Sequence, residues 1–362
     1  MNSIHLDNIG GTYNGNPLID MRTDFLGRPT QEMIEAMTRA AENPFTYGFR
    51  EDSVTTKLEK LAAGILAKED ALFLPTATMA NLIAASIHCL PGQEIVAEVK
   101  SHIFTLEGGG IAAFSGIMAK PISGKMGMMD LEELELAINT GTEQRSKTGL
   151  VWIENTHNLA GGTVLSCDQM AAVQKVACRF NIPVHLDGAR VFNAAVFLER
   201  PVSELTCYAD SVAVSLNKGL CAPLGAILAG KKGFIKEAGR IRLMLGGGWR
   251  PTGILAAAAI VALEKMIDRL TEDHKIARKI AQEIATCPNV FIDFKTVQTN
   301  LLYAQIKHPS LSVQEFVSRL KAQNILVNVA GPDRLRIAVH REIDTDKANK
   351  VIRAFQEISK HG

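Results

Sequence analysis

The sequence predicts an α/β protein with a mostly parallel seven-stranded sheet, helices on both faces and a small C-terminal α+β domain. Short apolar runs that end in polar residues or glycine alternate with longer segments of helical spacing, which is typical of repeated βα units. A change from apolar to charged composition near residue 270 marks the second domain. With 362 residues, the chain is also too long for one ordinary core.

The order of elements follows from these patterns. Seven apolar runs predict the strands of the sheet: Ala71–Leu74, Glu94–Val99, Ile117–Pro121, Leu150–Glu154, Val184–Asp187, Val212–Leu216 and Ala226–Ala229. Helical segments lie between them, including Met79–Cys89, Asp130–Asn139 and Cys167–Phe180, and an Ala/Leu-rich helix runs from Arg250 to about Leu270. Further on, the chain predicts helices over 272–286, 312–323 and 344–359, with strands near 290–293, 300–305, 325–329 and 334–339. We therefore expect an N-terminal arm over residues 1–20, a large domain over 21–270 and a small domain over 271–362.

Composition narrows the class of protein. Lys and Arg total 39 against 38 for Asp and Glu, so no net field favours nucleic acid or an anionic membrane. The six cysteines have no CxxC spacing, which favours reduced thiols over a disulfide framework or a zinc site. No stretch approaches 18 apolar residues, and the N-terminus does not resemble a signal peptide. We expect a cytoplasmic protein without nucleic acid, membrane or metal.

Two residues at predicted strand ends indicate a cofactor. Asp187 ends the run that begins at Ile182, and Lys218 follows the run that begins at Ser211. A lysine at such a position can form a Schiff base with pyridoxal phosphate, and an aspartate at the end of the preceding strand can keep its pyridine nitrogen protonated. Both residues are also common as solvated ends of strands, so this pair alone leaves both interpretations open.

A phosphate site is predicted where a strand leads into a helix. Thr76, Ala77 and Thr78 follow the run Ala71–Leu74 and open the helix that continues through Met79. Free backbone N–H groups and the helix dipole at such a start bind phosphate. An ordinary helix cap by Thr76 is the alternative.

Five stretches together resemble one enzyme family. They are Phe73–Asn81, Glu154–Asn158, His185–Ala194, Ser215–Leu220 and Met244–Arg250, and their order and spacing match the L-threonine aldolases. These are fold-type-I enzymes that depend on pyridoxal phosphate and are related to the β-eliminating lyases. The resemblance extends from about Leu18 to the C-terminus and implies the same fold, cofactor and homo-oligomeric assembly, a dimer or tetramer with shared active sites.

The resemblance also implies roles for residues around the cofactor. Lys218 would form the Schiff base, Asp187 would pair with the pyridinium nitrogen, and His102 would stack on the ring. Glu107 would orient a histidine or a water. The cofactor-binding set is Lys218, Asp187, Thr76, Ala77, Thr78, His102, Arg190 and Arg250, with Arg250 contributed in this fold by a neighbouring subunit.

Substrate-binding residues are implied in the same way. His157 resembles the histidine placed near the substrate β-hydroxyl, where a near-neutral pKa suits proton transfer. Arg190 and Arg336 match candidates for the carboxylate clamp, for which arginine has the required bidentate geometry. Thr23 stands where the family has a serine.

Two segments depart from the family pattern. The family sequence Ser-Asp-Thr-Val-Thr-Arg-Pro reads Thr23-Asp-Phe-Leu-Gly-Arg-Pro29 here, and its Tyr-Gly-Glu-Asp-Pro loop aligns with Phe49–Ser53. Phe25 and Arg50 therefore replace small residues that border the substrate side chain, which predicts a pocket for a larger or acidic β-substituent. The alternative is that both residues serve only a subunit contact.

The leading functional hypothesis is an aldolase that cleaves a β-hydroxy-α-amino acid into glycine and an aldehyde. A β-eliminating lyase on the same scaffold is the alternative, and it would release ammonia and a keto acid. A catalytically silent cofactor-binding protein is disfavoured because every core residue is retained. A dinucleotide-binding module is weaker still, because no GxGxxG segment follows a predicted strand.

Overall fold

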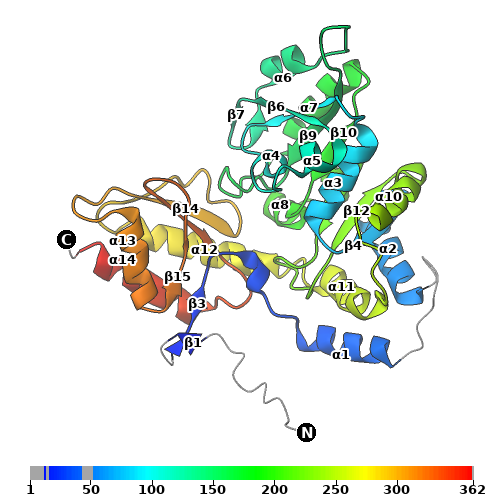
Figure 1. Ribbon diagram of the computed structural model, residues 1–362. Helices are drawn as coiled ribbons and strands as arrows, with labels where there is room; N and C mark the ends of the chain where they lie inside the picture. Colours follow the sequence, from blue (N-terminus) through cyan, green and yellow to red (C-terminus); the bar gives the residue numbers. More distant parts are fainter. Residues whose placement is uncertain (1–11, 14–15, 43–51, 361–362) are drawn as a thin grey trace. The chain divides into compact units, whose positions relative to one another are not determined.

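The computed structural model describes residues 12–13, 16–42 and 52–360. These divide into two compact units, which are described separately below: a large unit, residues 27–272, and a small unit, residues 1–26 with 273–362. Figure 1 shows the elements of both. Among the described residues, no helix combines the length and the apolar character needed to cross a membrane.

The large unit is built on a seven-stranded sheet of order β4-β12-β11-β10-β9-β5-β6. Neighbouring strands from β11 to β6 are parallel, whereas β12 runs antiparallel to both β11 and β4. Each strand lies within two residues of its predicted position: β4 Asp70–Leu74, β5 Glu94–Glu98, β6 Met118–Ile122, β9 Thr148–Glu154, β10 Val184–Asp187, β11 Ser211–Ser215 and β12 Ala226–Gly230. The predicted mostly parallel sheet is confirmed.

Both faces of this sheet are covered, because successive side chains of a strand point to opposite faces. In β4, Ala71 and Phe73 enter the main core, while Leu72 and Leu74 pack into a separate cluster on the other face. The helices of this unit are α1 Gln31–Ala41, α2 Ser53–Ile65, α3 Ala77–His88, α4 His102–Thr105, α5 Gly110–Ser115, α6 Leu131–Ala137, α7 Cys167–Arg179, α8 Val191–Leu198, α9 Ser203–Thr206, α10 Lys232–Met244 and α11 Gly253–Lys265. A short hairpin, β7 Gly124–Lys125 with β8 Met128–Met129, follows β6.

The Ala/Leu-rich helix is shorter than predicted. It ends as α11 at Lys265, and a turn leads to α12 Leu270–Ile284, inside which the chain passes from the large to the small unit.

The small unit has a four-stranded antiparallel sheet of order β13-β14-β17-β16. Its strands and helices are β13 Val290–Ile292, β14 Leu301–Ile306, α13 Val313–Ala322, β15 Ile325–Leu326, β16 Asn328–Val329, β17 Arg334–Ala338 and α14 Thr345–Ile358. Buried residues of α12, α13 and α14 form its core with the sheet. Each predicted element of this region is present.

The N-terminal residues differ from the predicted irregular arm. A hairpin, β1 Thr12–Tyr13 with β2 Asn16–Pro17, is followed by β3 Ile19–Asp20, which pairs in parallel with β15. Ile19 N donates to Asn324 O at 2.9 Å, and Met21 is fully buried in the small core. Residues 21–26, predicted in the large domain and ending in the 3-10 helix η1 Asp24–Leu26, also belong to the small unit. Apolar side chains at 19 and 21 explain this, because they complete a core formed by the other end of the chain.

Candidate active site

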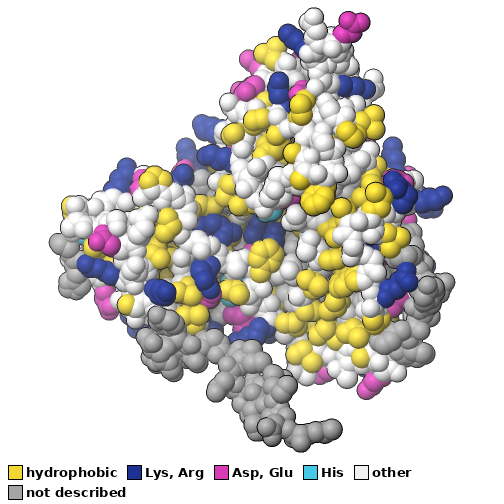
Figure 2. Space-filling view, viewed as in Figure 1, with side chains coloured by type: hydrophobic (Ala, Val, Ile, Leu, Met, Phe, Trp, Pro, Cys, Tyr) yellow, Lys and Arg dark blue, Asp and Glu magenta, His cyan; other side chains and the backbone are white. Residues whose placement is uncertain are grey.

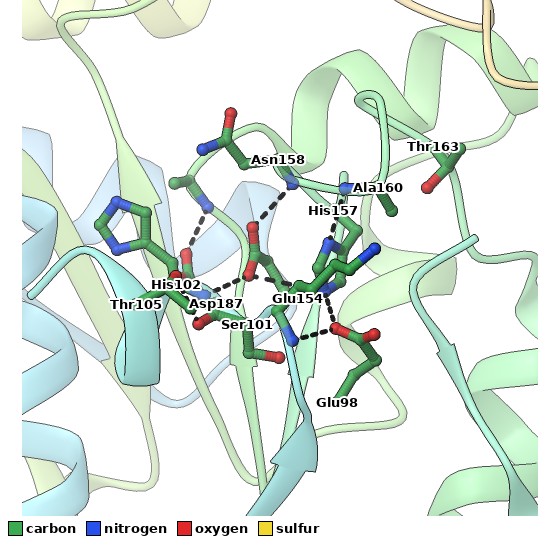
Figure 3. Close-up of polar contacts among 12 residues, drawn as sticks. Glu98, Ser101, His102, Thr105, Glu154, His157, Asn158, Ala160, Thr163 and Asp187 are labelled. Atoms are coloured by element: carbon green, nitrogen blue, oxygen red, sulfur yellow. Dashed lines mark hydrogen bonds and ion pairs between the residues drawn. The ribbon is translucent and has the colours of Figure 1, made fainter. Parts of the chain in front are cut away.

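The carboxyl ends of β10, β9 and β5 gather the polar residues of the large unit. In an open α/β sheet this edge is where ligands bind. Asp187 ends β10 directly opposite Glu154, which ends β9, and Glu98 ends the next strand, β5. All three carboxylates are buried. Figure 3 shows how these carboxylates lie relative to the histidines that follow β5 and β9.

Asp187 is fixed by two hydrogen-bond donors. Its Oδ2 accepts from Asn81 Nδ2 at 2.9 Å, and its Oδ1 accepts from Ala189 N at 3.1 Å. Both carboxylate oxygens accept a hydrogen bond, so rotation of the carboxylate would break one of them. The side chain is therefore held in one orientation at the end of a buried strand.

His102 and Glu107 lie beside this carboxylate. His102 Nδ1 is 2.8 Å from Glu107 Oε1, and one polar atom from each of His102, Glu107 and Asp187 lies within 4.8 Å of the others. Burial lowers the pKa of His102, but Glu107, Asp187 and Glu154 together raise that pKa above its ordinary value. Burial raises the pKa of Glu107, and nearby Asp187 raises it further. Because Nδ1 is engaged by Glu107, Nε2 is the His102 nitrogen left to meet a cofactor or substrate.

Glu154 fixes the start of α4. Its Oε2 accepts from His102 N at 2.7 Å, and its Oε1 accepts from Asn158 N at 2.8 Å (Figure 3). One carboxylate thereby ties the loop after β9 to the backbone that carries His102.

His157 lies in a second, closed cluster. Its Nε2 is 3.0 Å from Glu98 Oε2, and in the neutral ring its Nδ1 accepts from Ala160 N at 3.3 Å. The side chain has no exposed surface. Burial lowers its pKa, yet Glu154, Glu98 and Asp187 together raise that pKa above its ordinary value. Gly127, with φ of +84°, lets the β7–β8 hairpin close over the ring, since a Cβ there would lie 2.5 Å from His157 Cβ.

Lys218 follows β11, the strand that pairs with β10. Its carbonyl oxygen accepts from Cys221 N at 2.8 Å, and the residue is buried with 7% of its surface exposed. Arg190 is likewise buried, at the N-cap of α8 just after Asp187. The large unit thus brings Lys218, Asp187 and Arg190 to the ends of two adjacent strands.

The predicted phosphate site is the open first turn of α3. Thr76 caps the helix by accepting from Met79 N at 3.1 Å, so its hydroxyl serves as the ordinary cap, while Thr76 and Thr78 remain exposed. The glycine-rich turn before Arg250 packs on this helix turn, because a Cβ on Gly247 would lie 2.5 Å from Met79 Sδ. An exposed helix start beside a basic segment is suited to a phosphate.

Four predicted substrate-binding residues are not among the described residues of the large unit. Thr23, Phe25 and Arg336 belong to the small unit, where Arg336 Nη1 donates to Arg22 O at 2.9 Å and Phe25 is 51% exposed. Arg50 lies outside the described residues. The roles of these four residues stay predictions.

Comparison with known proteins identifies the family. Residues 20–307 match the family model described as Beta-eliminating lyase. The chain belongs to the beta-eliminating lyase family. It is 36% identical over 344 residues to low-specificity L-threonine aldolase 1 of Arabidopsis thaliana, a match that covers 94% of this chain and 96% of that protein. It is also 30% identical over 368 residues to alanine racemase TOXG of Cochliobolus carbonum, covering 98% of this chain and 91% of the relative.

Solved structures agree on the fold of this lyase family member. A threonine aldolase of Leishmania major superposes with a TM-score of 0.82 at 18% identity, covering 94% of this chain and 99% of that structure. The predicted resemblance and fold are therefore confirmed.

The residues present fit pyridoxal phosphate. A buried anion at Asp187, a buried lysine after the neighbouring strand and an open helix start are the three features that its ring nitrogen, aldehyde and phosphate require. Lys218 would hold it covalently, Asp187 would face its ring nitrogen, and the first turn of α3 would bind its phosphate.

Two site residues were missed by sequence reasoning. Glu98 is a carboxylate that ends a buried strand, which is the same signal that identified Asp187. Asn81 is a polar residue on a helix face that is otherwise apolar, and this mismatch could have identified it.

Proposed function

We propose that the protein is a pyridoxal-phosphate-dependent lyase that cleaves a β-hydroxy-α-amino acid, such as threonine, allo-threonine or a bulkier analogue, into glycine and an aldehyde. The observation that carries this proposal is the buried Asp187 carboxylate, held by two donors on the strand next to the one that leads to Lys218. When bound, pyridoxal phosphate supplies an electron sink for the bonds at the substrate Cα. The likeness to the Arabidopsis threonine aldolase supports the choice of reaction.

The chain's own residues have distinct tasks in this proposal. Lys218 Nζ holds the cofactor, and Asp187 keeps a proton on its ring nitrogen. Arg190 provides the buried cation for the substrate carboxylate. His102 Nε2 would be the nitrogen available to exchange a proton with the substrate, and Glu107 fixes the ring through Nδ1.

The direct role predicted for His157 at the β-hydroxyl has one structural condition. Both ring nitrogens have partners, at Glu98 and at Ala160, so contact with a substrate requires one of these interactions to break.

A β-eliminating lyase is the second candidate, because the description of the matched family model names that reaction. The same Asp187 and Lys218 would serve it, with a proton removed at Cα and a leaving group expelled from Cβ. The two candidates differ in products: glycine with an aldehyde, or ammonia with a keto acid.

The cofactor assignment is tested by reducing the loaded protein with borohydride and mapping the labelled peptide. We expect the label on Lys218. Lys68 is an internal control, because its ammonium already donates to Thr206 O and Ala209 O at 2.8 and 2.6 Å. A label on another lysine, or none, would refute the assignment.

We also propose a homo-oligomer, at least a dimer, in which Arg250 completes the phosphate site of a neighbouring subunit. Large hydrophobic side chains lie exposed on the large unit, among them Leu90, Phe114 and Met244, and Figure 2 shows hydrophobic side chains gathered on the face drawn. Such surface supports subunit contact. Light scattering of the holoenzyme tests this, and a fully active monomer would contradict it.

The cytoplasm is the proposed compartment. All six cysteines lie in the described part of the chain and are free thiols, which is in keeping with a reducing environment.

A further inference from the structure

Asn81 is a polar residue on the buried face of α3. Only 1% of its surface is exposed, and Ala84 and Ala85, three and four residues further along the same helix face, are fully buried apolar residues. Burying an amide lowers stability unless its donors and acceptor are all satisfied. The position of Asn81 therefore calls for specific partners.

One nitrogen of Asn81 contacts two carboxylates. Nδ2 donates to Glu107 Oε1 at 2.6 Å and to Asp187 Oδ2 at 2.9 Å, so both of its hydrogens are used. The opposite orientation of the amide would place its carbonyl oxygen against two carboxylate oxygens, all of them acceptors. The contacts thus fix which end of the amide faces Asp187.

A chain of neutral groups fixes the other end of the amide. Asn81 Oδ1 is 3.4 Å from His185 Nε2, and His185 Nδ1 is 2.8 Å from Ser211 Oγ, which is 2.8 Å from His88 Nε2. Because Oδ1 can only accept, Nε2 of His185 carries a hydrogen. If this ring is neutral, its Nδ1 accepts from the Ser211 hydroxyl, whose oxygen in turn accepts from His88 Nε2.

The pKa shifts of His88 and His185 agree with these hydrogen-bond directions, which require the His185 ring to be neutral. Burial lowers the pKa of His88 to about 4 and that of His185 well below its ordinary value, so both are neutral at neutral pH. Every donor in the chain then points toward the two carboxylates, an arrangement in which hydrogen bonds reinforce one another.

We propose that Asn81 is a positioning residue of the cofactor site, which holds Asp187 and Glu107 in place through the two hydrogens of one amide nitrogen. The inference rests on the proposed role of Asp187 toward the ring nitrogen. Oxygens of Glu107 and Asp187 lie within 4.8 Å of each other. Two carboxylates at such a distance share a proton unless hydrogen-bond donors stabilise both negative charges. Asn81 thereby stabilises the Asp187 carboxylate while Glu107 remains hydrogen-bonded to His102.

The test reads the cofactor without any substrate, so a failed aldolase assay leaves it intact. Asn81→Leu keeps the size of the side chain and removes both donors. Two quantities are measured on reconstituted protein: the affinity for pyridoxal phosphate and the pH midpoint of its visible absorbance. We expect the affinity to fall about tenfold and the midpoint to rise by on the order of one pH unit, because a less anionic Asp187 leaves the ring nitrogen less protonated.

Ser86→Ala is the matched control on the same helix. Its hydroxyl donates to Leu82 O at 2.7 Å and lies 2.6 Å from Ser115 Oγ, and neither partner contacts the carboxylates. We expect it to lower the melting temperature of the apoprotein while leaving the absorbance midpoint and the affinity unchanged. An equal midpoint shift in Ser86→Ala would mean that loosening α3 suffices, and would overturn the proposal.

A wild-type midpoint and affinity in Asn81→Leu would also overturn it. Should Asn81→Leu fail to fold, Asn81→Asp decides by the same two readings, because it keeps the shape of the side chain but places a third carboxylate in the cluster. We expect Asn81→Asp to lose more affinity than the roughly tenfold loss expected for Asn81→Leu, because the added negative charge repels both carboxylates. Wild-type readings in Asn81→Asp would equally refute the proposal.

Discussion

The two histidine clusters of the large unit use similar parts and differ in access. His102 pairs with Glu107 and His157 with Glu98, each at hydrogen-bonding distance. The side chain of His102 is 28% exposed and has one nitrogen left, whereas that of His157 is enclosed with both nitrogens engaged. The carboxylate partners raise the pKa of both histidines, so electrostatics alone does not distinguish them. Access does, and it makes His102 the better candidate for direct proton transfer.

The largest expected effect is that of Asp187→Asn, which removes the carboxylate beside His102 and Glu107. An amide cannot hold a proton on the ring nitrogen, so kcat on threonine should fall about 10²-fold or more, or roughly 3 kcal/mol of barrier, with the cofactor still bound. Asp210→Asn is the control, since Asp210 Oδ2 accepts from Val184 N at the opposite end of β10. Near-normal turnover of Asp187→Asn would remove Asp187 from the mechanism.

Exchanging each histidine for asparagine tests the comparison itself. His102→Asn should lower kcat by roughly 10²-fold, the usual contribution of a proton-transfer group, with little change in melting temperature. His157→Asn should lower the melting temperature more and kcat less. If His157→Asn costs as much activity as His102→Asn, the direct contact predicted for His157 is correct and the closed cluster opens during turnover.

Glu107→Gln tests how Glu107 affects the pKa of His102. Glu107 is the strongest of the influences that raise the pKa of His102 against the effect of burial. Losing its charge should move the His102 limb of the pH profile to lower pH by on the order of one unit and lower kcat about tenfold. Glu237→Gln, which changes an exposed pair with Arg240, provides the control. An unshifted limb would separate Glu107 from the titration of His102.

Glu98→Gln is expected to have the smallest effect, on stability rather than activity. The pKa of His157 is raised by folding, so its contribution is present below its ordinary pKa and is lost as pH rises through the folded value. The pKa of Glu98 is lowered, because His157 and Lys100 outweigh burial, so its contribution is lost as pH falls. The variant should therefore lose about 1 kcal/mol of unfolding free energy near pH 5 to 6, and less above pH 8. A loss independent of pH would show that the pair is not charged.

Much of the fold could be predicted from the sequence because six of the seven strands, all but the edge strand β6, are buried along nearly their whole length. Continuous apolar runs such as Val212–Leu216 therefore stand out. The antiparallel direction of β12 could not be predicted, since an apolar run does not indicate in which direction its strand runs in the sheet. Nor could the pairing of Ile19 with Ile325, because local patterns do not specify contacts between the two ends of a chain.

The candidate site was predictable where a polar residue ends an apolar run, as Asp187 does, or where the family resemblance supplied a role, as for His102. The burial of the His157 side chain was not predictable, because it depends on Gly127 in the β7–β8 hairpin, which is distant from His157 along the chain. The double contact of Asn81 was likewise hidden, because Glu107 and Asp187 lie 26 and 106 residues away along the chain.

Product stoichiometry tests the central claim most directly. The holoenzyme is incubated with threonine, and glycine, aldehyde, ammonia and keto acid are quantified together in wild type and in the Lys218→Ala variant. The account predicts glycine and aldehyde in equal amounts from the wild type and neither from Lys218→Ala. Ammonia and keto acid in equal amounts, without glycine, would contradict it and establish β-elimination in place of aldol cleavage.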